Sequence, residues 1–287
     1  MSDNILPSLR ETIDAYDLNA RKTLGQHFLL DMNITRKIAR LADVNPGDTV
    51  IEVGPGPGGL TRALLEMGAD VIAIERDDRC LDILDTLKRH AEATSTGTLT
   101  VLAEDALKVN FQTITEQKPV KFISNLPYNI STELLVRWLT LPAQCWQQMT
   151  LMFQREVAER ILAVPGNKIY GRLSVLSQSA SLPARGLNLP ARAFTPPPKV
   201  ESTVVTFDPA RKVDFPLPML ELISRHAFAQ RRKMVRTSLK PVFGAEVESQ
   251  LAEIGLAATL RAEDIDIASY QHLARLAAKF TAANISH

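Results

Sequence analysis

Short apolar segments alternate with longer amphipathic ones along much of the chain. The apolar segments have the length and the β-branched content of buried strands, and between the early ones the apolar positions recur at helical spacing. We predict helices over residues 60–67 and 81–90 and strands over residues 49–53, 70–75, 99–102, 120–124 and 149–153.

This alternation predicts an α/β fold, with a Rossmann-like, mostly parallel sheet between helices. Two later apolar segments, 173–179 and 202–207, have no clear helix between them, so we predict an antiparallel pair at the sheet edge. Residues 209–218 carry several prolines, and only helical patterns follow them. We therefore place the α/β domain at residues 1–210 and a small all-helical domain at residues 211–287.

Composition narrows the functional classes. With 45% apolar and 23% charged residues the chain is a globular protein. Its net charge of +1 excludes a protein that coats nucleic acid with a generally basic surface, so any site for a polyanion must be local. The two cysteines, Cys80 and Cys145, show neither metal-ligand spacing nor a disulfide pattern, so we expect reduced thiols and no metal. Since no segment resembles a signal peptide or a membrane span, we expect a cytoplasmic protein that binds no membrane.

The turn Gly54-Pro55-Gly56-Pro57-Gly58-Gly59 has G-x-G-x-x-G spacing, and Glu75 follows it by about twenty residues, as in nicotinamide enzymes. However, Pro55 and Pro57 each remove an N–H donor that a pyrophosphate cradle needs, and Glu52 would place a carboxylate near the phosphates. The turn suits a ligand without phosphate. S-adenosylmethionine, which carries a ribose diol, an adenine, an ammonium and a sulfonium, is such a ligand.

Polar residues lie at or just after the ends of the predicted strands, at Glu75, Asp105 and Asn125. In open parallel sheets ligands bind at the carboxyl ends of the strands. We expect Glu75 to accept the ribose hydroxyls, Asp105 to accept from the adenine amine, and Gly54 and Gly56 to line the same ligand. For each acid the alternative is a helix N-cap or a first-turn carboxylate.

The run Asn125-Leu126-Pro127-Tyr128 suits the exocyclic amine of a nucleobase, whose lone pair is delocalised into the ring. Two acceptors that hold both amino hydrogens bias such a nitrogen towards tetrahedral geometry. Asn125 offers a carboxamide oxygen and Leu126 a carbonyl, Pro127 stiffens the backbone, and Tyr128 offers a stacking face. The alternative is that these four residues form an ordinary turn at the end of a strand.

A basic run lies between residues 225 and 240, where six cations occur without an acid. This run is a local footprint for a polyanion such as a nucleic acid, and the alternative is a solvated helix face. We also expect Arg21 and Lys22 to add to that surface or to close over the cofactor. The predicted RNA contacts are Arg231, Arg232, Lys233 and Arg236.

The chain resembles the ribosomal RNA adenine N6-dimethyltransferases, in particular the bacterial 16S branch, over most of its length. The matching runs are Gly25-Gln26-His27-Phe28-Leu29, Glu52-Val53-Gly54-Pro55-Gly56, Asn125-Leu126-Pro127-Tyr128-Asn129-Ile130-Ser131, Gln154-Arg155-Glu156-Val157, Tyr170-Gly171-Arg172-Leu173-Ser174, Ala193-Phe194-Thr195-Pro196-Pro197-Pro198-Lys199-Val200 and Gln230-Arg231-Arg232-Lys233.

The resemblance implies a methyltransferase that uses S-adenosyl-L-methionine and releases S-adenosyl-L-homocysteine. Its substrate would be two adjacent adenosines in the 3′-terminal hairpin of 16S rRNA, in an immature 30S subunit, and we expect a monomer. The family often has Asn where this chain has His27. The implied cofactor contacts are His27, Leu29, Gly54, Glu75, Asp105 and Asn125.

Phe194 precedes the rigid Pro196-Pro197-Pro198 run, and we expect its ring to be a second stacking surface beside Tyr128, with a core residue as the alternative. Two other functions stay open at this point. One is a protein that inspects immature small subunits, with methylation secondary or absent, and the other is a nicotinamide oxidoreductase.

Overall fold

The structure, a computed structural model, describes residues 6–21, 24–94, 97–115, 118–210 and 213–285. It divides into two compact units. The first comprises Met1–Ala158 and Ala184–Asp208, and the second comprises Glu159–Pro183 and Pro209–His287. A single cut near residue 210 therefore does not describe the division, because Glu159–Pro183 groups with the C-terminal segment.

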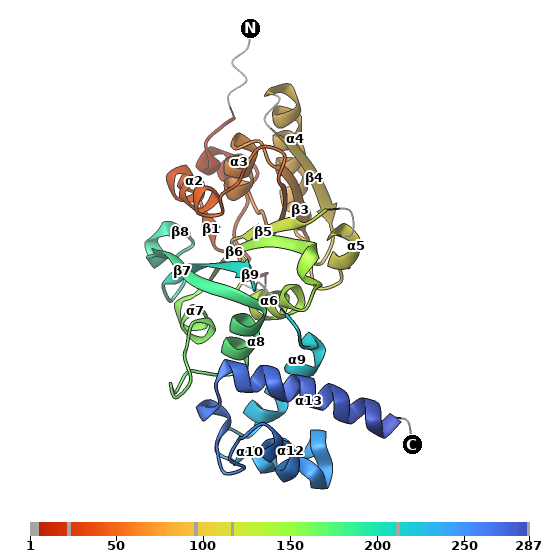
Figure 1. Cartoon of the computed structure of the whole chain (residues 1–287). Helices are drawn as coiled ribbons and strands as arrows, with labels where there is room; N and C mark the ends of the chain where they lie inside the picture. The colour runs from red at the N-terminus through yellow and green to blue at the C-terminus, as the bar shows by residue number, and fades with distance from the viewer. Residues whose placement is uncertain (1–5, 22–23, 95–96, 116–117, 211–212, 286–287) are drawn as a thin grey trace. The chain divides into compact units, whose positions relative to one another are not determined.

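The first unit is built on a seven-stranded sheet (Figure 1). The five strands from β4 to β6 are parallel, and β9 pairs with β6 in the antiparallel sense, so the sheet is mostly parallel with an antiparallel part, although the pair is not the predicted one between residues 173–179 and 202–207. In spatial order the strands are β4 (Thr98–Ala103), β3 (Asp70–Glu75), β2 (Thr49–Val53), β5 (Val120–Ser124), β6 (Trp146–Gln154), β9 (Ser202–Pro209) and β7 (Ser181–Leu189).

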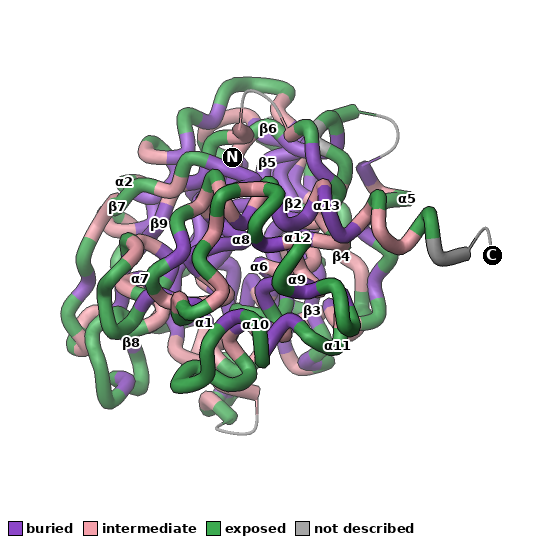
Figure 2. The backbone as a smooth tube through the Cα atoms, turned by 60° about the horizontal axis from the view of Figure 1, so that its bottom comes forward, coloured by how far each residue is buried: buried purple, intermediate pink, exposed green. Residues whose placement is uncertain are grey.

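Helices cover both faces of this sheet. In β5, Phe122 stacks on Trp138 of α6 and meets Phe111 of α5, whereas its neighbour Ile123 joins the apolar cluster that contains Leu64 of α3. Strands β2 and β5 are accordingly buried along their length (Figure 2). The helices of this unit are α1 (Leu9–Ala15), α2 (Met32–Leu41), α3 (Gly59–Glu66), α4 (Leu81–Thr94), α5 (Phe111–Thr115) and α6 (Ser131–Leu139).

A separate two-stranded sheet joins β1 (Phe28–Leu29) to β8 (Phe194–Thr195) in the antiparallel sense. Phe28 pairs with Thr195 and Leu29 with Phe194. This pairing was not predicted. It brings the N-terminal Gly25-to-Leu29 run against the proline-rich run that begins after Thr195.

Among its described residues the second unit contains helices, the start of β7 and the last residue of β9, and α7 begins in the first unit and ends in the second. Its core contains Tyr170 and Tyr270, whose hydroxyls donate to the carbonyls of Ile265 and Ala262. No described helix has the length and apolar content to cross a membrane. The helices are α7 (Arg155–Ile161), α8 (Arg172–Ala180), α9 (Leu217–Ala229), α10 (Val235–Ser238), α11 (Lys240–Phe243), α12 (Val247–Glu253) and α13 (Ile267–Ile285).

The strand predicted over residues 173–179 is wrong, because these residues form helix α8 and the strand β7 follows it. The Gly171 N–H donates to Ser174 Oγ and so caps the first turn of the helix. The helix then packs against α9, where Arg172 pairs with Glu221. A seven-residue segment with three apolar positions, as in residues 173–179, is compatible with either structure, and packing within this unit decides for a helix.

Candidate active site

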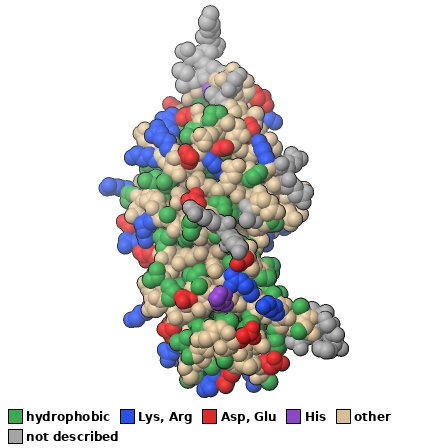
Figure 3. All heavy atoms as spheres, viewed as in Figure 1, with side chains coloured by type: hydrophobic (Ala, Val, Ile, Leu, Met, Phe, Trp, Pro, Cys, Tyr) green, Lys and Arg blue, Asp and Glu red, His purple; other side chains and the backbone are tan. Residues whose placement is uncertain are grey.

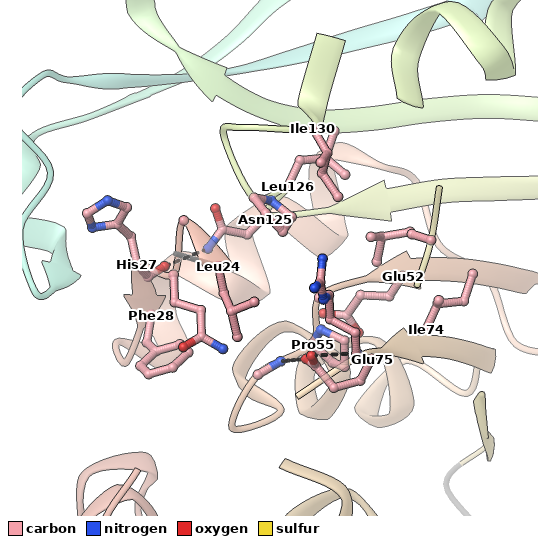
Figure 4. A pocket seen from close by; sticks show the side chains of 18 of the residues that line it. Leu24, His27, Phe28, Glu52, Pro55, Ile74, Glu75, Asn125, Leu126 and Ile130 are labelled. Carbon is pink, nitrogen blue, oxygen red and sulfur yellow. Dashed lines mark hydrogen bonds between the residues drawn. The ribbon is translucent and has the colours of Figure 1, made fainter. Parts of the chain in front are cut away.

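A cavity opens at the carboxyl ends of β2, β3 and β5, where the parallel sheet predicts a ligand site (Figure 4). Its empty volume, including the solvent-filled mouth, is about 920 Å³. Three segments that are far apart in the sequence line most of it, namely residues 24–29, the glycine turn with its flanks, and residues 125–130. The predicted cofactor residues His27, Leu29, Gly54, Gly56, Glu75 and Asn125 are all part of the lining.

The glycine turn lies so close to its neighbours that a Cβ at Gly54 or Gly56 would crowd them. Gly54 and Gly56 have φ angles of 69° and 54°, a region that favours glycine. A Cβ on Gly54 would lie 3.2 Å from Pro127 Cγ, and one on Gly56 would lie 2.9 Å from Phe28 Cε1. The two glycines therefore let the turn meet both other segments of the cavity wall.

Glu75, at the end of β3, is held by backbone donors. Its Oε2 accepts from the Gly56 N–H at 3.1 Å, and its Oε1 accepts from the N–H groups of Arg76 and Asp77 at 2.9 and 2.8 Å. Burial nevertheless raises the pKa of this carboxyl. These donors occupy three of the roughly four lone-pair sites of the carboxylate, so Oε2 keeps a site that can accept from a ligand hydroxyl.

Glu52 lies beneath the glycine turn and is only 2% exposed. Its Oε2 accepts from the Thr61 hydroxyl at 2.7 Å. Burial, reinforced by the nearby charge of Glu75, raises its pKa to about 8. The cavity therefore has two buried carboxyls whose ionised forms are poorly solvated, and a cationic ligand would stabilise those forms.

Asp105 has a different setting, since its neighbours Glu104 and Ala106 line the cavity instead. Its Oδ1 accepts from the Leu107 N–H at 3.0 Å, and its Oδ2 lies 3.4 Å from Arg76 Nη1. These contacts are those of an aspartate that caps a turn, because residues 106–108 form a turn and the next helix begins only at Phe111. Contact with an adenine stays a prediction for Asp105.

Asn125 and Leu126 follow β5 and both line the cavity. The Asn125 Nδ2 donates to the His27 carbonyl at 3.0 Å, which fixes the amide (Figure 4). Within the described residues, neither Asn125 Oδ1 nor the Leu126 carbonyl accepts a hydrogen bond. The two acceptors that the sequence suggested are thus adjacent and available.

Two contacts fix the Tyr128 side chain. The His27 imidazole stacks on its ring, with 5.4 Å between centroids and 29° between planes, and the Tyr128 hydroxyl lies 2.6 Å from Ser202 Oγ. His27 itself donates from Nδ1 to the Pro196 carbonyl at 2.8 Å, and its ring points away from Glu75 (Figure 4). The His27 imidazole therefore supports the Tyr128 ring and does not point towards the carboxylate of Glu75.

Phe194 does not present the open face that we expected. It is 3% exposed and packs in the main apolar cluster of the first unit, which also contains Leu29 and Val204. Its pairing with Leu29 across the small sheet turns the ring into that cluster. The core-residue alternative describes Phe194 in this structure.

The predicted RNA contacts separate into two groups, both in the second unit. Arg231 donates to the carbonyls of Lys168 and Tyr170 at 2.8 Å and pairs with Glu263 at 3.2 Å, so it ties segments of that unit together. Arg236 pairs with Glu248 at 3.3 Å. In contrast, Arg232 and Lys233 are exposed, and their side chains have no ion-pair or hydrogen-bond partner among the described residues.

Of the two N-terminal cations, Lys22 lies outside the described residues, and Arg21 belongs to the first unit, 4.0 Å from Asp77. Sequence reasoning assigned no role to Gln26, which lines the cavity, or to Asp77 and Ser202, which lie outside the lining and bond to Gln26 and Tyr128. For Asp77 the available signal was its position two residues after Glu75 at the same strand end. No group of three or more His, Cys, Asp or Glu side chains in the described segments could hold a metal.

Comparisons with known proteins agree with this geometry. A family model described as "Ribosomal RNA adenine dimethylase" matches residues 17–279. Proteins named "Ribosomal RNA small subunit methyltransferase A" are 50% identical in Phenylobacterium zucineum, over 96% of this chain and 94% of that protein, and 52% identical in Caulobacter vibrioides, over 89% and 96%.

Among solved structures, a dimethyladenosine transferase from Plasmodium falciparum has a TM-score of 0.70 and 25% identity, over 86% of this chain and 96% of that one. The 23S rRNA methyltransferase ErmE shares the fold, with a TM-score of 0.61 and 23% identity over 88% and 99%. The predicted fold class and the predicted ribosomal RNA methyltransferase activity are confirmed by these matches. The chain belongs to the ribosomal RNA adenine dimethylase family.

Proposed function

We propose that the protein transfers methyl groups from S-adenosylmethionine to N6 of two adjacent adenosines in the 3′-terminal hairpin of 16S rRNA, and thereby contributes to 30S maturation. The family match and the names of the relatives support the class of substrate. The observation that carries the proposal is the pair of unpaired acceptors on Asn125 and Leu126 beside a cavity with buried carboxyls.

The residues around the cavity fit S-adenosylmethionine better than a dinucleotide. Two buried carboxyls suit a ligand with a diol and cationic groups, and they would repel a pyrophosphate. Glu75 would hold the ribose hydroxyls, and Glu52 with the glycine turn would face the charged amino-acid end. Asp105 would accept from the adenine amine. When bound, the cofactor supplies a methyl group that its sulfonium already activates.

Asn125 would then orient the target amine. Because its Nδ2 is engaged by the His27 carbonyl, the amide presents Oδ1 as the acceptor, and the Leu126 carbonyl is the second. Two acceptors positioned in advance stabilise the developing charge on the nitrogen without reorganisation. The alkylated amine is acidic, so its proton passes to water or to a carbonyl, and no strong base is needed. One N–H remains for a second round.

The target adenine must leave its hairpin stack to reach this site, and stacking on an aromatic ring offsets part of that cost. Tyr128, fixed by His27 and Ser202, would supply the ring. Basic and acidic side chains are mixed over the face drawn in Figure 3, so RNA contact must be local. Arg232 and Lys233 are the unpaired cations of the predicted set, and we assign this contact to them.

We further propose that the protein acts as a monomer, in the cytoplasm, on an immature 30S particle. The test is methyl transfer from labelled S-adenosylmethionine to small subunits that lack the modification. Label in N6,N6-dimethyladenosine of the small-subunit RNA is expected, with large subunits as the control. Calorimetric preference for NAD, or label in another nucleoside, would refute the proposal. Binding to small subunits without methyl transfer would favour the alternative of a protein that inspects immature small subunits.

A further inference from the structure

A buried carboxylate outside the cavity, Asp77, connects two segments that form the cavity wall. We propose that Asp77 is a positioning residue. It holds the loop of Glu75 and the segment of Gln26 and His27 at fixed positions relative to each other, and it thereby sets cofactor affinity. The identity of the ligand rests on the proposed function. Asp77 is absent from the described cavity lining, so it acts through Glu75 and Gln26.

The first connection runs through the backbone of Asp77. Its N–H donates to Glu75 Oε1 at 2.8 Å, beside the Arg76 N–H at 2.9 Å. The other oxygen of Glu75 accepts from Gly56. The backbone of Asp77 therefore helps to fix the carboxylate that we assign to the ribose.

The second connection runs through the side chain of Asp77. Its Oδ2 accepts from Gln26 Nε2 at 2.8 Å, and Gln26 Oε1 accepts from the Arg21 N–H at 2.9 Å. The residue after Gln26 is His27, whose carbonyl accepts from Asn125. A continuous path of hydrogen bonds and backbone thus links the ribose carboxylate to the amide that we assign to the target base.

The charge of Asp77 is compensated locally by Arg79. The guanidinium donates to both carboxylate oxygens, at 2.9 Å from Nε and 2.6 Å from Nη2, and its Nη1 donates to the Asn19 carbonyl at 2.9 Å. The hydrogen bond from Arg79 is the main cause of a lowered pKa of about 2 for Asp77. The side chain is 1% exposed, and an asparagine there would offer Arg79 and Gln26 one neutral oxygen in place of two charged ones, so at least one of these donors would lose its partner.

Apolar packing joins the same two segments independently of the charge. Leu18 and Phe28 form a buried cluster with Cys80, Ile83 and Leu84, which follow Asp77 in the chain. This cluster would keep the N-terminal segment attached in a variant that lacks the carboxylate. We therefore expect the position of the segment to loosen while the first unit stays folded.

The test uses the full chain with Asp77→Asn, and with Asp78→Asn as the matched control, since Asp78 is the adjacent exposed acid. Calorimetry is expected to show about tenfold weaker binding of S-adenosylmethionine and of S-adenosylhomocysteine for Asp77→Asn only. Turnover at saturating cofactor should stay within about twofold of the wild type. Partial misfolding would instead lower the binding stoichiometry and the turnover at an unchanged Kd.

A second variant, Gln26→Glu, places two carboxylates in contact and should also weaken binding. Adding Asp77→Asn to it removes the like-charge contact, so in that background the same substitution should strengthen binding. Hydrogen exchange of residues 24–29 without cofactor should be faster in Asp77→Asn than in Asp78→Asn.

Equal affinities and exchange rates for the two aspartate variants would overturn the inference, as would a double variant that binds more weakly than Gln26→Glu alone. A wild-type protein that binds no S-adenosylmethionine would overturn the proposed function. The exchange difference would still test the positioning by Asp77 in that case.

Discussion

Replacing Glu52 by Gln is expected to stabilise the first unit at alkaline pH and to flatten its pH dependence. Burial raises the pKa of Glu52 from its ordinary 4.5 to about 8. A carboxyl with a higher pKa in the folded state stabilises the fold while it is protonated. This stabilisation is complete below about pH 4.5 and is lost as the pH rises through about 8. Glutamine keeps the shape and an acceptor for Thr61, and it has no proton to lose.

The size of the effect follows from the two pKa values. Between pH 6 and pH 9 this one carboxyl should remove roughly 3 kcal/mol from the unfolding free energy of the wild type. Glu52→Gln should lose none of that amount. Glu75 also has a raised pKa, but it is present in both proteins, so most of its contribution cancels in the comparison.

The assay is urea unfolding of the ligand-free protein at pH 6 and pH 9, followed by tryptophan fluorescence. Both tryptophans of the chain, Trp138 and Trp146, are buried in the first unit, so the signal reports the unit that contains Glu52. Glu92→Gln, at an exposed position of α4, is the control. If Glu52→Gln loses as much stability as the wild type between the two pH values, the reasoning is refuted.

Asn125→Ala should lower turnover by about 10² to 10³ while calorimetric cofactor affinity changes little, and near-normal turnover would remove its orienting role. Replacing Arg232 and Lys233 by Ala should flatten the salt dependence of RNA binding, measured by fluorescence anisotropy, by up to about two units of slope. An unchanged slope would show that the side chains of Arg232 and Lys233 face solvent and do not contact RNA. Gly56→Ala forces a Cβ to 2.9 Å from Phe28, so thermal melts should show a loss of about 1–3 kcal/mol, and an unchanged melting temperature would contradict this close approach.

The parallel part of the fold could be predicted because its signals are local. Each of the strands β2 to β6 contains an apolar segment, and the glycine turn marks the end of β2. The error at α8 has a physical origin. Residues 173–179 are too few for their periodicity to separate helix from strand, and the structure decides through packing against α9 in the second unit.

The site could be predicted as far as topology determines it. Strand ends meet at one edge of a parallel sheet, which places Glu75 and Asn125 at the same cavity. The burial of Phe194 and the internal role of Arg231 depend on contacts between segments that are far apart in the sequence. Arg231 donates a hydrogen bond to the carbonyl of Lys168, 63 residues away in the sequence, and Gln26 donates one to the carboxylate of Asp77, 51 residues away. A single sequence does not record such pairings.

The most direct test is mass spectrometry of ribosomal RNA from cells that lack this gene, before and after the gene is returned. Wild-type protein should restore N6,N6-dimethyladenosine at two adjacent positions of the 3′-terminal small-subunit hairpin, and Asn125→Ala, expressed at the same level, should not restore it at an equal rate. The proposed function would be contradicted if those adenosines were dimethylated without the gene, or if the missing modification lay in the large subunit.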